Sequence, residues 1–218
     1  MEFLSLLDCP NLINIIDSKV DAKIKLDGKD ETTRPIVVLE YAEKGELYDY
    51  ISNAGAFNHD VCRAVIKKLI RAIEFMHEKG VTHRDLKLEN ILFDSNFELK
   101  VSDFGLSTPI EGHEGDGVLR SRVGTEGFRP PEMEKGNYTG LQADIFAIGV
   151  ILFLMYAGSP PFLSTKTSDK VYKRIREGKF NSFWQLHEKK KDEGFYSEPF
   201  KKLMNSFFSA DPSRRPTF

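Results

Sequence analysis

A short polar run in the middle of the chain carries side chains that could act together on a phosphate. The run extends from His83 to Asn90, and Asp103 follows it within the tripeptide Asp-Phe-Gly. Asp85 could orient a hydroxyl, and Lys87 could place a cation near a moving phosphate. Asn90 and Asp103 supply the hard oxygen ligands that magnesium prefers. Each residue alone is more simply explained as a loop hydrogen bond or a solvated charge, but their order and spacing together predict phosphoryl transfer.

The elements that must position this run change along the chain from strands to helices. The first part alternates apolar residues and has a hairpin signal at Asp27-Gly28, which predicts antiparallel strands over 13–26 and 36–39. A long amphipathic helix is expected to begin after Asn58 and to end at Gly80. Further helices are expected over 46–53, 140–156, 168–177 and 197–209. The predicted fold class is therefore α+β, with a small antiparallel β unit, a mainly helical body and the polar chemistry on loops.

Composition and charge exclude several classes of protein. The formal net charge is -2 and no clustered basic excess stands out, so we expect no nucleic-acid partner. The apolar stretch from Ile145 to Gly158 is too short for a membrane span and predicts a buried core helix, so we expect no membrane partner. The basic run Lys189-Lys190-Lys191 is expected to be a solvated loop. Cys9 and Cys62 lack metal-ligand spacing, so we expect reduced thiols and an intracellular location, in the cytoplasm or the nucleus.

Over essentially its whole length the sequence resembles the eukaryotic protein kinases. The resemblance rests on the run 83–90, on Asp103-Phe104-Gly105 and on the segment 124–132, where Pro130 replaces the alanine that the family usually has. Lys87 and Thr125 resemble the Ser/Thr branch. Residues 158–162 are similar to the calmodulin-dependent and AMP-activated group.

The resemblance implies a protein kinase-like fold in two parts. Residues 1–42 would be a remnant of the N-lobe that holds the end of helix C, two strands and the hinge. Residues 43–218 would be the C-lobe, with the catalytic loop, the activation segment and the helical body. Within the C-lobe, Asp144 would brace the backbone of the catalytic loop, Arg215 would pair with Glu132, and Thr125 would contact Asp85 and Lys87.

ATP and Mg²⁺ are the cofactors that the resemblance implies. Asp85, Lys87 and Asn90 would be catalytic, and Asn90 and Asp103 would bind the metal. Leu39 would be the gatekeeper, Glu40 and Ala42 would form the hinge, Glu46 would approach the ribose and Leu92 would form the floor of the adenine site. The full implied set for the nucleotide is Leu39, Glu40, Ala42, Glu46, Lys87, Glu89, Asn90, Leu92 and Asp103.

One family feature is missing from the sequence. Protein kinases cover the phosphates with a G-x-G-x-x-G loop and reach them with a lysine paired to a glutamate. No such loop occurs here, and the glutamate would fall just before Met1. We therefore expect a truncated Ser/Thr kinase domain with little activity on its own. The alternative is a catalytically inactive, truncated kinase-like scaffold or binding module. A small-molecule phosphotransferase is disfavoured, because the segment 124–132 docks peptides in the family.

The expected partners are a protein substrate and an upstream activating kinase acting on Ser121. In the family, an arginine at the position of Arg84 receives a phosphate from the activation segment, and Ser121 has the matching spacing. Ser107, Thr108 and Thr125 are rival sites, and an ordinary loop serine is the plainer alternative for Ser121. A phosphate there would order the segment from Ser107 to Ser121.

Overall fold

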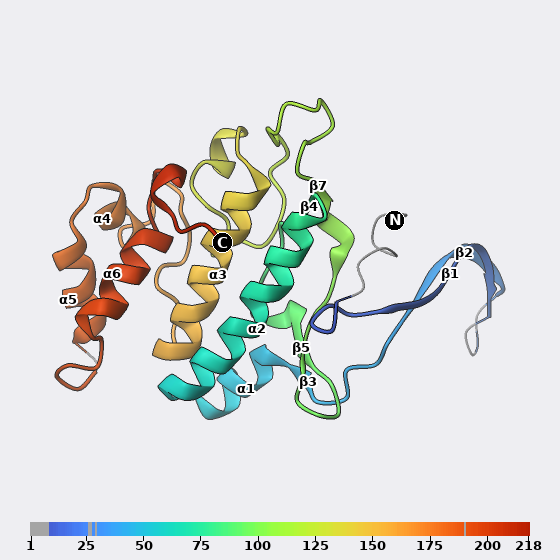
Figure 1. Ribbon diagram of the computed structural model, residues 1–218, viewed down its shortest axis with the longest axis horizontal. Helices are drawn as coiled ribbons and strands as arrows, with labels where there is room; N and C mark the ends of the chain where they lie inside the picture. The colour runs from blue at the N-terminus through green and yellow to red at the C-terminus, as the bar shows by residue number, and fades with distance from the viewer. Residues whose placement is uncertain (1–8, 26–27, 29, 190) are drawn as a thin grey trace.

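The computed structural model describes residues 9–25, 28, 30–189 and 191–218. It shows a two-stranded ribbon at one end of the molecule and helices α4, α5 and α6 at the other (Figure 1). Strands β1 (Ile15–Ile24) and β2 (Thr32–Leu39) pair in antiparallel fashion, as the sequence predicted. Of the predicted turn, Gly28 has a positive φ of 75° and Asp27 lies outside the described residues. The predicted end of helix C falls largely on residues 1–8, which also lie outside them.

The ribbon buries little apolar surface. Ile16 is 66% exposed and Val20 is 72% exposed, whereas Ala22 is the buried residue of β1. At its base, the backbone of Ile13 donates a hydrogen bond to the Val101 carbonyl. The ribbon is therefore held mainly by its own ladder and by this attachment.

Two small sheets surround the polar run. Strand β3 (Gly45–Glu46) pairs with β5 (Ile91–Phe93), which pairs with β6 (Leu99–Val101). Strand β4 (Val81–Thr82) pairs with β7 (Thr108–Pro109). Both pairings bring residues before and after the polar run close together. The described chain also contains short 3₁₀ turns at Leu88–Asn90, Phe104–Leu106, Met133–Lys135 and Pro212–Arg214.

Six α-helices are present in the described part of the chain. Their bounds are Leu47–Ala54 (α1), His59–Glu78 (α2), Gly140–Ala157 (α3), Tyr172–Arg176 (α4), Phe180–Glu188 (α5) and Glu198–Phe207 (α6). The prediction that Asn58 caps α2 is confirmed, because its side chain accepts a hydrogen bond from the Val61 backbone at 2.9 Å. The prediction of a helix over 168–177 was wrong in length. The Asp169 carboxylate accepts the backbone N–H groups of Leu163, Ser164, Val171 and Tyr172, and so it holds a turn before the helix begins.

Helix α3 is the centre of the core. By length and composition it could span a membrane, but 78% of it is buried inside the protein, so it is the core helix that the sequence predicted. It packs on α2 and α6. The contact with β4 requires glycine at the start of α3, because a Cβ on Gly140 would lie 2.3 Å from Thr82 Cγ2. This close approach brings α3 against the strand that leads into the polar run 83–90.

Candidate active site

The loop that follows β4 is anchored to α3 by one buried carboxylate. Asp144 is 1% exposed. Its Oδ2 accepts hydrogen bonds from Thr82 Oγ1 at 2.7 Å and from the His83 backbone at 2.9 Å, and its Oδ1 accepts one from the Arg84 backbone at 2.8 Å. The His77 side chain lies 2.9 Å from Oδ2. The prediction that Asp144 braces this loop is confirmed.

Electrostatics keep this anchor charged. Burial alone would raise the pKa of Asp144, but the hydrogen bond and charge of His77 and the backbone N–H of Arg84 hold it below its ordinary value. Asp144 is therefore a carboxylate at neutral pH, and it can accept all these hydrogen bonds at once.

His83 fixes the loop from the other side. Its Nε2 lies 3.0 Å from the Ser102 carbonyl, which can only accept, and its Nδ1 accepts the Asp85 backbone N–H at 3.2 Å. One ring nitrogen thus donates and the other accepts, which defines a neutral imidazole. Burial lowers the pKa of His83, in agreement with this neutral form.

The Asp85 side chain is held in one orientation by Thr125, and its second carboxylate oxygen faces the Lys87 ammonium. Its Oδ1 accepts hydrogen bonds from the Thr125 backbone at 2.8 Å and from Thr125 Oγ1 at 2.7 Å. Its Oδ2 lies 3.6 Å from Lys87 Nζ. The predicted contact of Thr125 with Asp85 is confirmed, and a hydrogen bond between Thr125 and Lys87 is not found among the described residues.

A glycine allows the segment of Thr125 to approach this loop. Gly124 has a φ of 88°, a conformation that L side chains rarely adopt, and a Cβ there would lie 2.5 Å from the Arg84 carbonyl oxygen. The carbonyl of Arg84 precedes Asp85 directly. Gly124 therefore sets the distance between the two segments that meet at Asp85.

Asn90 and Asp103 are brought together through Ser102. Asn90 Nδ2 donates to the Asp85 carbonyl at 2.8 Å, and the Asn90 carbonyl accepts from the Ser102 backbone at 2.9 Å. Asp103 follows, exposed and with a φ of 60°, and its Oδ1 accepts the Gly105 N–H at 3.2 Å. Among the described residues, Asn90 Oδ1 makes no hydrogen bond.

This donor set fits magnesium. Mg²⁺ is bound by oxygen, commonly through one or two protein side chains together with water and phosphate oxygens. An anchored amide with a free oxygen and an exposed carboxylate provide such ligands. The described residues hold no cluster of three or more His, Cys, Asp or Glu side chains suited to a metal, so a site built wholly from protein ligands is not seen there.

Of the residues that the sequence assigned to the nucleotide, Glu46 and Leu92 are neighbours in the structure. Glu46 stands opposite Leu92 in the pairing of β3 with β5, so the residues predicted at the ribose and at the adenine floor are neighbours. Leu39, at the end of β2, is 43% exposed. The Ala42 carbonyl accepts a hydrogen bond from the Gly45 backbone at 3.2 Å.

The Glu40 side chain connects the end of the ribbon to the body. Its Oε1 lies 2.8 Å from Lys100 Nζ on β6, and both carboxylate oxygens accept hydrogen bonds from Asn14. The adjacent Tyr41 is 82% exposed. Sequence reasoning assigned the Glu40 carbonyl to adenine and did not foresee this ion pair, which depends on a lysine 60 positions away.

Glu89 lines a cavity next to the loop that holds Asp85. This cavity has a volume of about 230 Å³, and Glu89 lines it with Tyr48, Glu126, Phe128 and Leu163. Glu126 directly follows Thr125, which contacts Asp85, so the cavity adjoins the same loop. Sequence reasoning assigned no role in a site to Tyr48 or Leu163. They are 47% and 78% exposed, and no motif in the sequence marks them.

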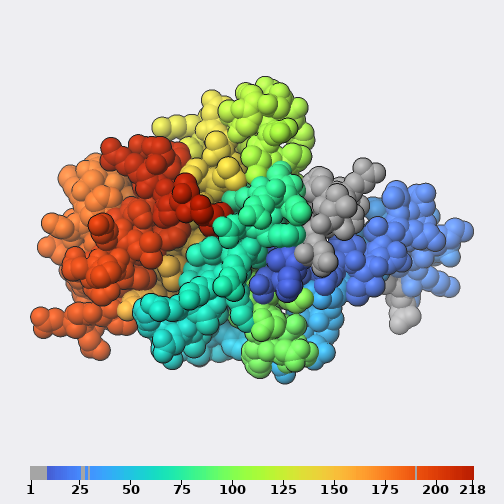
Figure 2. Space-filling model, in the orientation of Figure 1, coloured from blue at the N-terminus to red at the C-terminus, as the bar shows by residue number. Residues whose placement is uncertain are grey.

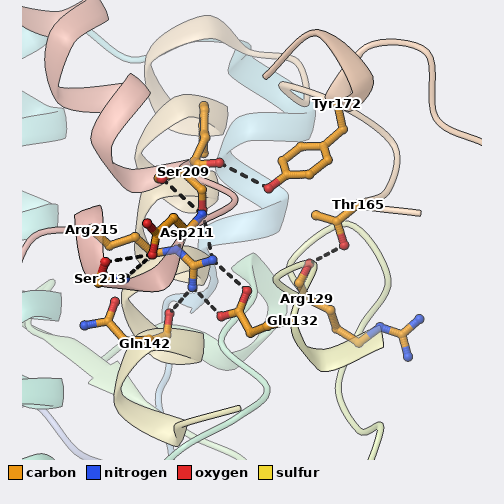
Figure 3. A network of polar contacts seen from close by, with 10 residues as sticks. Arg129, Glu132, Gln142, Thr165, Tyr172, Ser209, Asp211, Ser213 and Arg215 are labelled. Carbon is orange, nitrogen blue, oxygen red and sulfur yellow. Dashed lines mark hydrogen bonds and ion pairs between the residues drawn. The ribbon is translucent and has the colours of Figure 1, made fainter. Parts of the chain in front are cut away.

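A buried ion pair fixes the end of the segment 124–132. Arg215 Nη1 and Nη2 bond to the two Glu132 oxygens at 2.5 and 2.7 Å (Figure 3). The guanidinium also donates to the carbonyls of Gln142 and Ser209. The Arg215 side chain is fully buried, and its position over the Phe146 ring completes its surroundings. The predicted pairing of Arg215 with Glu132 is confirmed.

Comparison with known proteins assigns the family. A model of the protein kinase domain matches residues 1–218. The chain belongs to the protein kinase domain family. Among curated proteins, it is 38% identical over 179 residues to CBL-interacting protein kinase 11 of Oryza sativa subsp. japonica, which covers 82% of this chain and 34% of that protein. It is 41% identical over 150 residues to CBL-interacting serine/threonine-protein kinase 3 of Arabidopsis thaliana, which covers 68% of this chain and 34% of that protein.

This kinase domain chain thus corresponds to about a third of the length of these relatives. A third relative, CBL-interacting protein kinase 31 of Oryza sativa subsp. japonica, is 38% identical over 185 residues and is matched over 39% of its length. The predicted resemblance to the protein kinases is confirmed, and the relatives fall in the expected branch.

Proposed function

We propose that this protein is a Ser/Thr protein kinase that transfers the γ-phosphate of ATP to hydroxyls of a protein substrate. The arrangement at Asp85 carries the proposal. One carboxylate oxygen is held by Thr125, and the other faces Lys87 at 3.6 Å. A substrate hydroxyl at Oδ2 would be oriented and could pass its proton to Asp85, and the Lys87 ammonium would stabilise the charge on the transferred phosphate.

The cofactors of this reaction would be ATP and Mg²⁺. When bound, they supply the phosphoryl group and neutralise the charge on its oxygens. Asn90 and Asp103 would hold the metal, because their oxygens are available and of the preferred kind. The backbone from Glu40 to Ala42 would take the adenine, and Glu46 and Leu92 would line the rest of the pocket. In this proposal residues 1–42 belong to the N-lobe and residues 43–218 to the C-lobe.

Preference for Ser and Thr is part of the proposal. It is supported by Lys87 and Thr125 at the positions typical of that branch, and by a relative at 41% identity whose name describes a serine/threonine-protein kinase.

A non-catalytic binding module is the second candidate, and the ribbon favours it. Val37, Val38 and Leu39 of β2 are all more than a third exposed, and so are Ile16 and Val20 of β1. Exposed apolar patches commonly mark protein contacts. A binding module would need no chemistry at Asp85, so a substitution of Asp85 separates the two candidate functions.

The test is phosphate transfer from labelled ATP to Ser-, Thr- and Tyr-containing peptides by the protein and by Asp85→Asn. A positioned acid–base group contributes roughly 10²- to 10⁴-fold, so we expect a loss of that size in kcat. Asp60→Asn on α2 is the matched control, since its side chain is 99% exposed, and it should be neutral. No transfer by the parent protein, or equal rates for parent and Asp85→Asn, would favour the binding module.

Regulation through Ser121 is also proposed. Arg84 Nη1 donates a hydrogen bond to Ser121 Oγ at 2.9 Å, and the Tyr138 hydroxyl donates one to the Ser121 carbonyl at 2.9 Å. A cavity of about 230 Å³ adjoins Ser121 and is lined by Arg84, His113 and Arg120. Glu114 also lines this cavity, and Arg120 is paired with Glu114 and Asp116, so a phosphate on Ser121 would meet chiefly the Arg84 guanidinium and would have room.

The rival sites are less accessible. Thr108 is buried, the Ser107 hydroxyl is buried, and the Thr125 hydroxyl is bonded to Asp85, whereas Ser121 is exposed. We expect an upstream kinase to phosphorylate Ser121 and Ser121→Ala to block the resulting activation. Ser95→Ala, in the exposed turn between β5 and β6, is the control. Full activation of Ser121→Ala would refute this part.

A further inference from the structure

Around α4, away from the catalytic residues, the chain carries a local excess of positive charge that its overall net charge conceals. Residues 166–179 contain six basic side chains and two acidic ones, a net charge of +4. The whole chain carries -2, so the remainder carries -6. In Figure 1, α4 lies at the end of the molecule that is opposite the ribbon.

The two acidic residues leave part of this charge uncompensated. Asp169 is occupied by four backbone N–H groups. Glu177 lies 2.8 Å from Lys179 and 3.7 Å from Lys173. Among the described residues, no carboxylate pairs with Lys170, Arg174 or Arg176, so three cations remain.

Lys170 is exposed, and the half-buried Arg174 and Arg176 bond to neutral oxygens. Arg174 donates to Ser182 Oγ and to the Lys170 carbonyl, both at 3.1 Å. Arg176 donates to the Thr167 carbonyl at 3.4 Å. Tyr172 and Ile175 are the buried residues of α4. The backbone thus presents the guanidinium groups without neutralising them.

The surface is connected to the catalytic site. Lys166 lies 2.8 Å from Glu126, and Glu126 follows Thr125, whose hydroxyl bonds to Asp85. Leu163, whose backbone bonds to Asp169, also lines the cavity beside Glu89. A chain that passes Asp85 and continues over Glu126 would therefore reach the segment 166–176.

We propose that Lys166, Lys170, Lys173, Arg174 and Arg176, the α4 basic surface, dock a carboxylate-rich segment of the protein substrate a few residues from its acceptor hydroxyl. The inference rests on the proposed kinase function and adds a substrate class. The positive charge of this surface favours a negatively charged peptide segment as its ligand. A nucleic acid or an anionic membrane would extend beyond this one element, and the -6 of the remaining chain would repel it.

The experiment compares two peptides that share an acceptor serine, one with a block of four glutamates and one with four glutamines. Binding is measured by fluorescence anisotropy without ATP, on the protein and on Asp85→Asn. We expect the glutamate peptide to bind about tenfold more tightly at low salt, with the difference shrinking as salt screens the charges. Because no transfer is needed, loss of activity with intact docking would count against the kinase proposal alone.

Two substitutions test the surface itself. Lys170→Gln with Arg174→Gln should remove the preference for glutamate and leave the glutamine peptide unaffected. Lys67→Gln with Arg71→Gln on α2 is the control, an exposed pair with the same four-residue spacing. The charge-reversed variant Lys170→Glu with Arg174→Glu should instead prefer a lysine-block peptide, which shows that the variant still folds and binds. Equal binding of the two peptides, an unchanged double variant, or tighter binding of phosphatidylserine vesicles or RNA through these residues would overturn the proposal.

Discussion

The catalytic loop and the β1–β2 ribbon are attached to the molecule in opposite ways. The loop is anchored by buried Asp144, which accepts the backbone N–H groups of His83 and Arg84, and by the neutral, buried His83 side chain, which bonds to the Ser102 carbonyl. The ribbon bonds mainly to itself and exposes Ile16 and Val20. The space-filling view shows the same contrast, with the ribbon extending from a closely packed body (Figure 2).

This difference indicates which half of the site is preorganised. Catalysis of phosphoryl transfer depends on positioning and electrostatic stabilisation, and groups fixed before the substrate arrives need no reorganisation. Asp85, Lys87 and Asn90 have that character. At the predicted hinge, the Glu40 side chain contacts the body through Lys100, and its other partner, Asn14, lies at the base of the ribbon, so the hinge can adjust when a nucleotide binds.

The largest contrast is expected between two ion pairs. Arg215→Met leaves Glu132 buried without its partner, and we expect a loss of about 3–5 kcal/mol in the free energy of unfolding. Lys23→Met breaks the exposed ribbon pair with Glu31, whose atoms lie 3.6 Å apart, and should cost at most about 0.5 kcal/mol. Urea denaturation of both variants measures this, and similar losses would remove the distinction between the two regions.

Asp144→Asn should produce the next largest effect. The amide has only one oxygen, so a buried donor from Thr82, His83 or Arg84 loses its acceptor, at about 1–3 kcal/mol for each lost bond. Transfer activity should fall as well, because the loop moves away from Asp85. A variant with full stability and reduced activity would show that Asp144 acts on the chemistry alone.

Acid sensitivity should arise in the body. Burial lowers the pKa of His83, so below about pH 6.5 the unfolded state binds a proton that the folded state does not. Stability is therefore complete above the unfolded pKa and falls as the pH drops toward the folded pKa, by at most about 1.4 kcal/mol per pH unit for this group. Burial of His187 acts with the same sign.

Unfolding curves from pH 7.5 to pH 5 check this for the protein and for His83→Gln. The variant should start less stable and show a shallower dependence on pH. The ribbon contains no histidine and should not contribute. An equally steep curve for His83→Gln would place the sensitivity elsewhere.

The smallest effect is expected on the ribbon. Ile16→Ala removes a side chain that is 66% exposed, and surface substitutions of this kind usually change stability by no more than about 0.5 kcal/mol. Ile151→Ala, at a fully buried position of α3, is the matched comparison and should cost about 2–5 kcal/mol. Thermal melts of both variants measure this difference, and a similar loss of stability in both would show that Ile16 is packed as closely as Ile151.

The sequence could predict features that depend on residues close together in the chain, but not those that depend on contacts between distant segments. The order of polar residues from His83 to Asp103 and the apolar run of α3 are local signals, and they indicated the catalytic loop and the core helix. Helix α5 was missed because its burial depends on Phe183 and Trp184 packing against Phe153 of α3. The pairing of Glu40 with Lys100 likewise depends on a tertiary contact that no local pattern encodes.

Amide hydrogen exchange tests the contrast between loop and ribbon most directly. The backbone N–H groups of His83 and Arg84 donate to buried Asp144, so they should exchange only when the whole domain unfolds. The amides of β1 and β2 should exchange far faster, through local opening, and Mg²⁺ with ATP should slow exchange at the hinge around Glu40 while leaving His83 and Arg84 unchanged. Exchange of the His83 and Arg84 amides at the rate of the ribbon would contradict a preorganised catalytic loop.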